Sequence, residues 1–177
     1  IEGTTTPVSF VYDVLFPYAR ARISAYLTKH WGTDGLRADV DNLVAQAAAD
    51  GVSMPQADAS DAERLAAVQA YVHSLMDADR KITGLKSIQG KLWRDGYADA
   101  SAEGLRGDVF DDVPKALTRA QAAGVRVFIY SSGSIEAQKL LFGYSRFGDL
   151  TGSLSGYFDT TTGPKREADS YKKIAAE

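Results

Sequence analysis

Apolar residues recur with helical spacing through the first part of the chain. The first such segment covers residues 7–27 and contains Pro17. Proline has no backbone N–H and disfavours a helical conformation in the residue before it, so a kink or two consecutive helices are expected at Pro17. A second helix is predicted before Gly51, marked by Val40, Leu43, Val44 and Ala47.

Two more helices are predicted before residue 104. Ser60 followed by Glu63 is the signature of a capping box, which favours a long helix from there to about Asp79. The next apolar residues predict a fourth helix over residues 83–94. The inward positions are expected to be Leu65, Val68, Val72 and Leu75 in the third helix and Leu85, Ile88 and Leu92 in the fourth. Residues 7–104 are therefore predicted to form an all-helical insert that contributes no strand to a sheet.

After residue 104 the predicted elements alternate between helices and strands. One helix has Pro114 just inside its start and Gly124 just past its end. Residues 125–130 (Val-Arg-Val-Phe-Ile-Tyr) are mostly β-branched and aromatic, which predicts a central, buried strand. A further helix, a short strand over residues 156–159 and a final helix from Lys165 complete the pattern. This order is typical of a parallel α/β sheet.

The residues Ser131, Ser132, Gly133 and Ser134 follow the predicted strand and precede a helix. Ligands of open α/β sheets bind at the carboxyl ends of strands. Free backbone N–H groups, the positive end of a helix and short hydroxyl side chains together suit a phosphate group. A serine there can equally cap the helix, and adjacent serines could divide the two roles. This segment alone leaves both interpretations open.

Two other segments are candidates for the same chemistry. Lys165 follows a Thr-Thr-Thr-Gly-Pro loop at the same edge of the predicted sheet, where its ammonium group could hold a phosphoryl oxygen. Taken alone, a solvated lysine in a first helical turn is the commoner outcome. Because Ser131 and Lys165 both follow strand ends, they are expected to lie close together. Glu2 precedes a turn rich in glycine and threonine, which is either a frayed terminus or a catalytic loop.

The remaining chemically capable residues are predicted to have structural roles. His30 and His73 stand alone on different helices, without partners at metal-ligand spacing. Trp93 and Tyr97 could line a substrate pocket, although such residues on helices more often pack. The three aspartates within residues 108–112 are expected to serve the amino end of the following helix rather than a metal ion.

Composition excludes several classes of function. Twenty basic and 23 acidic side chains give a net charge of −3, which does not favour nucleic acid or an anionic membrane as a partner. No window approaches the roughly 20 apolar residues that span a bilayer. The absence of cysteine excludes disulfides, thiolate metal sites and cysteine nucleophiles. A phosphate site must therefore be local, and a cytoplasmic enzyme is expected.

Together these segments resemble the haloacid dehalogenase superfamily. Residues 1–5 (Ile-Glu-Gly-Thr-Thr) resemble its first motif, Asp-x-(Asp/Glu)-Gly-Thr, without the leading Asp. Residues 128–132 are similar to the second motif, a hydrophobic strand that ends in Ser or Thr. Lys165 stands where the third motif has its basic residue. The resemblance implies an α/β fold, a Rossmannoid parallel sheet with an inserted all-helical cap domain.

The resemblance also implies domain boundaries. Residues 1–6 and 105–177 would form an incomplete α/β core of the haloacid dehalogenase type, and residues 7–104 would form the helical cap. The nucleophilic Asp would lie before Ile1, and the fourth motif, which supplies an acidic metal ligand, would lie beyond Glu177. The chain is therefore expected to be truncated at both ends and, by itself, to be inactive.

Within the superfamily, longer segments resemble the acireductone-forming enolase-phosphatases. These segments are residues 1–5, 14–20, 89–94, 129–134 and 136–143. A glutamate at position 2, where most relatives have aspartate, is a further mark of that family. The resemblance implies a magnesium-dependent enolase-phosphatase of methionine salvage. It would enolise 2,3-diketo-5-methylthiopentyl-1-phosphate and release phosphate and the acireductone 1,2-dihydroxy-3-keto-5-methylthiopentene.

The same resemblance assigns roles to individual residues. Glu2 would bind Mg²⁺ through its backbone carbonyl and act as general acid and base through its carboxylate. Ser131, Ser132 and the amide of Gly133 would bind the phosphate, while Lys165 would offset its charge. The cap would cover the methylthio end of the substrate and exclude water, with Trp93 as one of its residues.

A different class of function remains open at this point. A catalytically inactive fragment or pseudoenzyme would bind a phosphorylated ligand or a protein partner without turnover. A capped phosphatase for a sugar phosphate fits the family-specific segments less well. A monomer that acts on a small phosphorylated diketone, without nucleic-acid or membrane partners, is expected.

Overall fold

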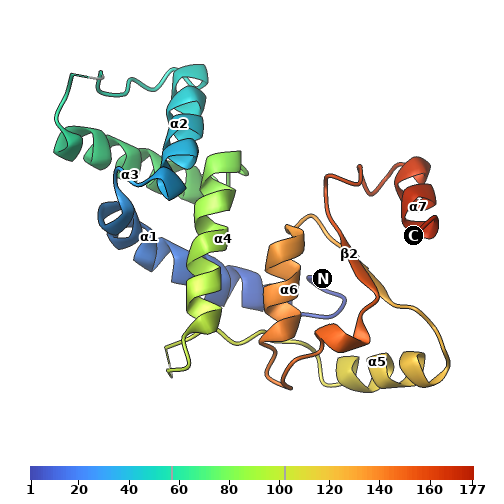
Figure 1. Cartoon of the computed structure of the whole chain (residues 1–177). Coiled ribbons are helices and arrows are strands. Elements are labelled where there is room, and N and C mark those ends of the chain that lie inside the picture. Colours follow the sequence, from blue (N-terminus) through green and yellow to red (C-terminus); the bar gives the residue numbers. More distant parts are fainter. Residues whose placement is uncertain (57, 102) are drawn as a thin grey trace. The chain divides into compact units, whose positions relative to one another are not determined.

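A computed structural model describes residues 1–56, 58–101 and 103–177. The chain is a mixed α/β protein with a small parallel sheet (Figure 1). Its elements in chain order are η1 (Phe10–Leu15), α1 (Phe16–His30), α2 (Asp34–Ala49), α3 (Asp61–Asp77), α4 (Thr83–Ala98), α5 (Val113–Ala122), β1 (Phe128–Tyr130), α6 (Ile135–Gly143), η2 (Thr151–Ser153), β2 (Gly156–Phe158) and α7 (Ala168–Ala175).

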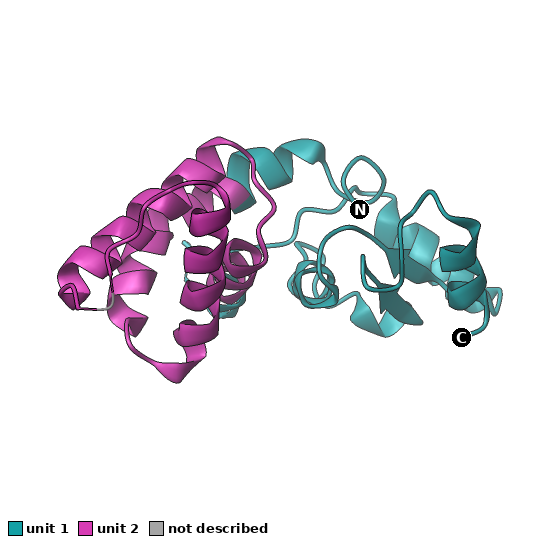
Figure 2. Cartoon of the chain, turned by 90° about the horizontal axis from the view of Figure 1, so that it is seen from above, with its two compact units in different colours: residues 1–15, 94–177 teal, residues 16–93 magenta. Residues whose placement is uncertain are grey.

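The chain divides into two compact units, coloured separately in Figure 2. The helical unit is Phe16–Trp93, and the sheet unit combines Ile1–Leu15 with Arg94–Glu177. The first helical pattern is realised as two consecutive helices, because η1 ends at Leu15 and α1 begins at Phe16, next to Pro17. This confirms the effect expected of the proline.

The helical unit has a continuous apolar core. Its buried members come from one face of each helix and are Ala19, Ile23, Leu27, Leu36, Val40, Leu43, Ala47, Val68, Tyr71, Val72, Leu75, Leu85, Ile88 and Leu92. The predicted inward positions of α3 and α4 belong to this core, with Leu65 packed at its margin. Among the described residues of this unit there is no strand. No helix in the described parts of the chain is both long and apolar enough to cross a bilayer.

The predicted capping box is present at the start of α3. The Ser60 hydroxyl accepts the Glu63 N–H at 3.3 Å, and the Ser60 N–H donates to the Glu63 carboxylate at 3.0 Å. These bonds satisfy two backbone groups that a helix start leaves without partners. The helix ends at Asp77, slightly before the predicted Asp79, which has a φ of 49°.

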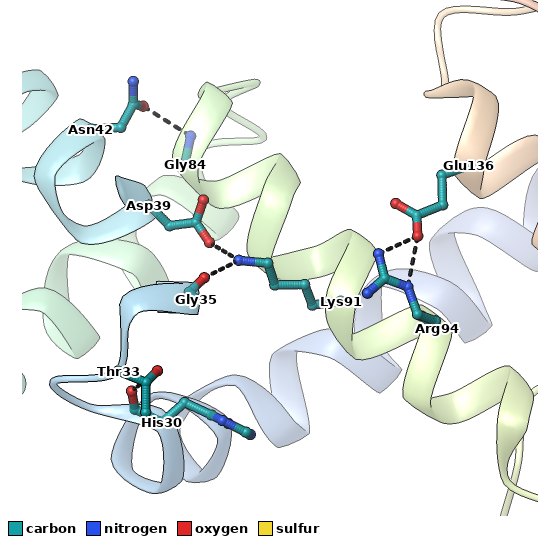
Figure 3. A network of polar contacts seen from close by, with 9 residues as sticks. All are labelled: His30, Thr33, Gly35, Asp39, Asn42, Gly84, Lys91, Arg94 and Glu136. Atoms are coloured by element: carbon teal, nitrogen blue, oxygen red, sulfur yellow. Dashed lines mark hydrogen bonds and ion pairs between the residues drawn. The ribbon is translucent and has the colours of Figure 1, made fainter. Parts of the chain in front are cut away.

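A partly buried ion pair joins α2 to α4 (Figure 3). The Lys91 ammonium donates to the Asp39 carboxylate at 2.6 Å and to the Gly35 carbonyl at 2.5 Å. Nearby, the Asn42 side chain accepts the Gly84 N–H at 2.9 Å. A Cβ atom at Gly84 would lie 2.7 Å from the Asp39 carbonyl oxygen, so only glycine allows this close approach of the two helices.

A second polar network holds the end of α2 against α3. The Asp50 carboxylate accepts the Tyr71 hydroxyl at 2.6 Å, the Arg80 guanidinium at 3.1 Å and the Gln46 amide at 2.9 Å. The Tyr71 bond, then those of Arg80 and Gln46, lower the pKa of Asp50 to about 2. Burial, followed by the bond to Asp50, raises the pKa of Tyr71 to about 12. Both shifts keep Asp50 ionised and Tyr71 neutral across the physiological range.

Asp50→Asn is expected to destabilise the helical unit at pH 7 and to lose that effect in acid. Because the pKa of Asp50 is depressed on folding, its stabilising contribution is present above its ordinary value, near 4, and disappears as the pH falls towards about 2. Urea unfolding of both proteins at pH 7 and at successively lower pH checks this. Asp41→Asn, an exposed change on the same helix, is the control. A stability difference that is constant with pH would contradict the prediction.

The sheet unit contains two parallel strands. β1 pairs with β2 in the register Phe128↔Gly156, Ile129↔Tyr157 and Tyr130↔Phe158, with α6 in the connection. Parallel pairing and an intervening helix were both predicted from the alternation of patterns. The unit's core includes Val109, Leu117, Ile129, Leu141 and Phe142, all buried.

The predicted strand over residues 125–130 is shorter than expected. β1 begins at Phe128, and Val125 is 57% exposed. The cause is the end of α5, where Gly124 has a φ of 67° and the Val125 N–H donates back to the Ala120 carbonyl at 2.9 Å. Val125 thus belongs to the helix terminus. Ile129 is buried, but the sheet of the described residues pairs β1 on one side only, so its predicted central place is not realised there.

The predicted role of the aspartates in residues 108–112 was wrong for two of the three. Asp108 and Asp111 form ion pairs with Arg146 at 3.1 and 2.6 Å. Arg146 also donates to the Val109 carbonyl, and so fastens this loop to the segment after α6. Asp112 does precede α5, but its side chain makes no capping bond. Arg146 is distant in the sequence, so helical pattern alone did not indicate the pairing.

Candidate phosphate-binding site

A pocket of about 570 Å³ lies at the carboxyl ends of β1 and β2. It is lined by Tyr130, Ser131, Ser132, Thr160, Gly163, Pro164, Lys165, Arg166 and Glu167. The two segments predicted to handle phosphate, after β1 and after β2, therefore meet in one place. This is the edge of a parallel sheet where ligands ordinarily bind.

The serines after β1 have different environments. Ser131 is only 3% exposed, its N–H donates to the Phe158 carbonyl at 3.1 Å, and its hydroxyl accepts the Gly133 N–H at 3.3 Å. Ser132 is exposed and lines the pocket. Ser134 is the N-cap of α6 and accepts the Ala137 N–H at 3.2 Å. Capping thus falls to Ser134, which leaves the Ser132 hydroxyl facing the pocket.

The start of α6 is also held by a carboxylate that sequence reasoning missed. Asp159 accepts the Ile135 N–H at 3.2 Å with one oxygen, and the Thr161 N–H and hydroxyl at 2.9 and 2.7 Å with the other. A negative charge is favourable at a helix amino end. The Ile135 N–H is thus bonded to Asp159 and is not available to a bound anion. The signal available in the sequence was an acidic residue directly after a strand.

Gln138 is a second connection between the two loops. It is 1% exposed, and its amide donates to the Gly133 carbonyl at 2.8 Å and to the Phe158 carbonyl at 2.9 Å. A buried amide with two such bonds restricts the movement of both backbone segments. The turn after β1 and the end of β2 are therefore linked by side chains as well as by the sheet.

Lys165 does not lie in a helix, contrary to the prediction. α7 begins at Ala168, and Lys165 lies in the turn before it, exposed along the pocket. Its ammonium nitrogen is 5.7 Å from the centroid of the Tyr130 ring, a cation–π distance. Since Tyr130 directly precedes Ser131, the predicted proximity of Lys165 to the serine segment is present.

The first loop is a tight turn. The Ile1 carbonyl accepts the N–H groups of Thr4, Thr5 and Thr6 at 3.0, 2.9 and 3.2 Å. The Glu2 side chain itself is exposed.

The aromatic and histidine candidates each contact neighbouring side chains. Trp93 belongs to the helical unit, where it stacks on Phe16 with ring centroids 6.4 Å apart. Tyr97 is 2% exposed in the sheet unit, and burial raises its pKa. His73 meets the Ser24 hydroxyl at 2.9 Å, and the His30 ring lies 4.4 Å from that of Tyr26.

Metal ligation is limited in the part of the chain that the structure describes. No three His, Asp or Glu side chains there converge where they could hold a metal ion. Magnesium prefers carboxylate oxygens and water in octahedral geometry. The described residues therefore do not make a complete magnesium site, and Glu2 remains the candidate for a single ligand.

Comparison with known proteins identifies close relatives. No family model matches the chain. It is 51% identical over 177 residues to enolase-phosphatase E1 of Synechococcus elongatus, covering 100% of this chain and 72% of that protein. It is 49% identical over 181 residues to a probable bifunctional methylthioribulose-1-phosphate dehydratase/enolase-phosphatase E1 of Vitis vinifera, covering 98% of this chain and 34% of that protein.

A solved structure agrees with the sequence comparison. The UTR4 protein of Saccharomyces cerevisiae superposes with a TM-score of 0.69 at 34% sequence identity, covering 99% of this chain and 72% of that one. Identity near one half across the full chain is too high for a shared fold alone, and it does not favour an unrelated phosphate-binding module. The chain belongs to the enolase-phosphatase E1 family, the acireductone-forming enolase-phosphatases of the haloacid dehalogenase superfamily.

Proposed function

We propose that the protein carrying this chain converts 2,3-diketo-5-methylthiopentyl-1-phosphate to 1,2-dihydroxy-3-keto-5-methylthiopentene and phosphate in methionine salvage. The observation that supports this most strongly is the 51% identity to an enolase-phosphatase over all 177 residues. The pocket at the ends of β1 and β2 is of the kind the reaction requires, because it combines hydroxyl groups with a cationic side chain. An inactive binding protein is the less favoured alternative.

Within this proposal the phosphate is held by Ser132, by backbone N–H groups near Gly133, and by Lys165. The Ser131 hydroxyl orders the turn by accepting the Gly133 N–H. Donors held in place before the substrate arrives stabilise developing charge on phosphoryl oxygens without reorganisation. Lys165 adds a positive charge at the same pocket. These assignments are supported by the convergence of both segments on one pocket.

Glu2 is proposed as the proton-transfer group for enolisation and leaving-group protonation. A carboxylate near the reacting carbon can remove a proton and then return it. The resemblance of residues 1–5 to the first motif of the superfamily supports this role for Glu2. Magnesium is proposed as the cofactor, with the Glu2 carbonyl as one ligand.

The helical unit, Phe16–Trp93, is proposed to form most of a cap domain that spans residues 7–104. Its separate apolar core supports this, because such a unit can pack independently of the sheet. Trp93 is proposed to recognise the apolar methylthio end of the substrate. We also propose a cytoplasmic monomer without nucleic-acid partners, in line with the small net charge of −3.

The polypeptide of residues 1–177 alone is expected to show no turnover, whereas the product of the complete gene converts the diketone phosphate. An enzyme-bound phosphoryl group needs an acceptor, and the first motif places that Asp before Ile1. Phosphate release and acireductone formation, measured together with Mg²⁺ present, check both halves. Release of phosphate without acireductone by the complete protein would contradict the proposed substrate chemistry. Turnover by residues 1–177 alone would show that the nucleophile is misplaced.

A further inference from the structure

The loop that carries Lys165 is held by side chains over residues 162–165. Four successive carbonyl groups each accept a bond from a side chain elsewhere in the sheet unit. The donors are Lys173 to Thr162 at 3.2 Å, Tyr130 to Gly163 at 2.5 Å, Ser170 to Pro164 at 2.8 Å and Tyr171 to Lys165 at 2.8 Å. A loop without regular structure ordinarily has few such restraints.

The backbone of this loop can come so close to α7 only because residue 163 is glycine. Gly163 has a φ of 139°, and a Cβ atom there would collide with the Ser170 side chain. Ser170 is itself only 2% exposed, so its hydroxyl is not free to turn to solvent. The contact between the loop and α7 is therefore close, and the Ser170 side chain is buried in it.

The two tyrosine donors also contact each other and Lys165. The rings of Tyr130 and Tyr171 meet edge to face with centroids 5.7 Å apart. The Lys165 ammonium lies 5.7 Å from the Tyr130 ring centroid, and the Tyr171 hydroxyl binds the carbonyl of Lys165 itself. Tyr130 thus restrains the ammonium group of Lys165 through its ring, and the preceding part of the loop through its bond to the Gly163 carbonyl. Tyr171 restrains the backbone of Lys165 itself.

We propose that Tyr130 and Tyr171 are positioning residues, which hold Lys165 in place for a phosphoryl group. This rests on the role of Lys165 in the proposed function. A lysine side chain has four flexible carbon atoms, and its ammonium group is a point charge whose effect depends on where it is held. The hydroxyls act on the backbone beneath it, so their loss moves the charge without removing it.

Tyr130→Phe and Tyr171→Phe test the proposal, because each removes one hydroxyl and retains the ring contacts. In the product of the complete gene, each is expected to lower kcat/KM for the diketone phosphate about three- to tenfold, the effect of one lost hydrogen bond. Inhibition by inorganic phosphate should weaken by a similar factor. Tyr157→Phe is the matched control, since this tyrosine lies on the neighbouring strand and its buried hydroxyl has no hydrogen-bond partner among the described residues.

A double-mutant cycle with Lys165→Ala separates positioning from general stability. If Tyr130 acts through Lys165, then Tyr130→Phe should have almost no further effect on kcat/KM once Lys165 is alanine. Equal losses in both backgrounds, or a loss that follows only a lower thermal unfolding midpoint, would overturn the positioning role and leave the proposed function intact. Unchanged kinetics of Lys165→Ala alone would instead overturn the role of Lys165 in the proposed function, and this inference with it.

Discussion

Lys165→Ala is expected to lower kcat/KM for the diketone phosphate by about 100- to 1000-fold in the complete enzyme, as the loss of a preorganised electrostatic group does. The charge lies in a pocket beside Ser131 and Ser132, and its loop is held by four side-chain bonds, so the charge is held in place before the substrate binds. Steady-state kinetics with the diketone phosphate measure the effect.

The neighbouring residues allow sharp controls for this change. Lys172→Ala removes an exposed lysine on α7 that pairs with Asp169 and does not line the pocket, and it should leave the kinetics unchanged. Lys165→Arg should recover only part of the activity, because a planar guanidinium does not reproduce the position of an ammonium group. Kinetics of Lys165→Ala equal to those of the wild type would remove this residue from the site.

Replacing Ser131 and Ser132 together by alanine is expected to lower turnover by about 100- to 1000-fold and to weaken phosphate binding. The two hydroxyls contribute differently. Ser132 is exposed to the pocket and is the direct donor, whereas Ser131 is buried and accepts the Gly133 N–H at 3.3 Å. Without Ser131 that amide has no acceptor and the turn loses its order. Kinetics of the double variant and phosphate inhibition measure both effects.

A change in the same turn is the control for the serine variant. Ser134 caps α6, so Ser134→Ala should lower stability by about 1 kcal/mol but leave kcat/KM close to that of the wild type. Single variants separate the two roles further. Ser132→Ala alone is expected to raise KM, with only a small effect on the free energy of unfolding. A double variant that binds phosphate and turns over normally would exclude this turn from the site.

The helices of this protein could be predicted because their signals are local. The three- and four-residue spacing of apolar side chains indicated the buried faces of α3 and α4, and the Ser60–Glu63 capping box indicated where α3 begins. Pro17 likewise marked the change from η1 to α1. Errors arose at boundaries, where a long-range or terminal bond competed with local preference. Val125 is an example, since its N–H completes the end of α5 and is unavailable to the sheet.

The candidate site was predicted in part. The position of Ser131 and Lys165 after strand ends was enough to place them near each other, because parallel strands align their carboxyl ends. Their supports were not predicted. Asp159 at the start of α6, Gln138 between the two loops and Arg146 on the aspartates of residues 108–112 each act on a partner distant in the sequence. No periodic pattern encodes such a bond.

The sequence by itself determined which segments are helices and strands, which residues could bind phosphate, and to which family the motifs are similar. These follow from periodicity, caps and motif spacing, which depend on neighbours along the chain. Only the tertiary structure decided that Lys165 lies in a turn, and that Tyr130, Ser170 and Tyr171 hold this turn. The bond from Tyr130 joins residues 33 positions apart, and its existence depends on how β1 packs beside the loop after β2. The position of the charge is thus a property of packing, whereas its chemical type is a property of the sequence.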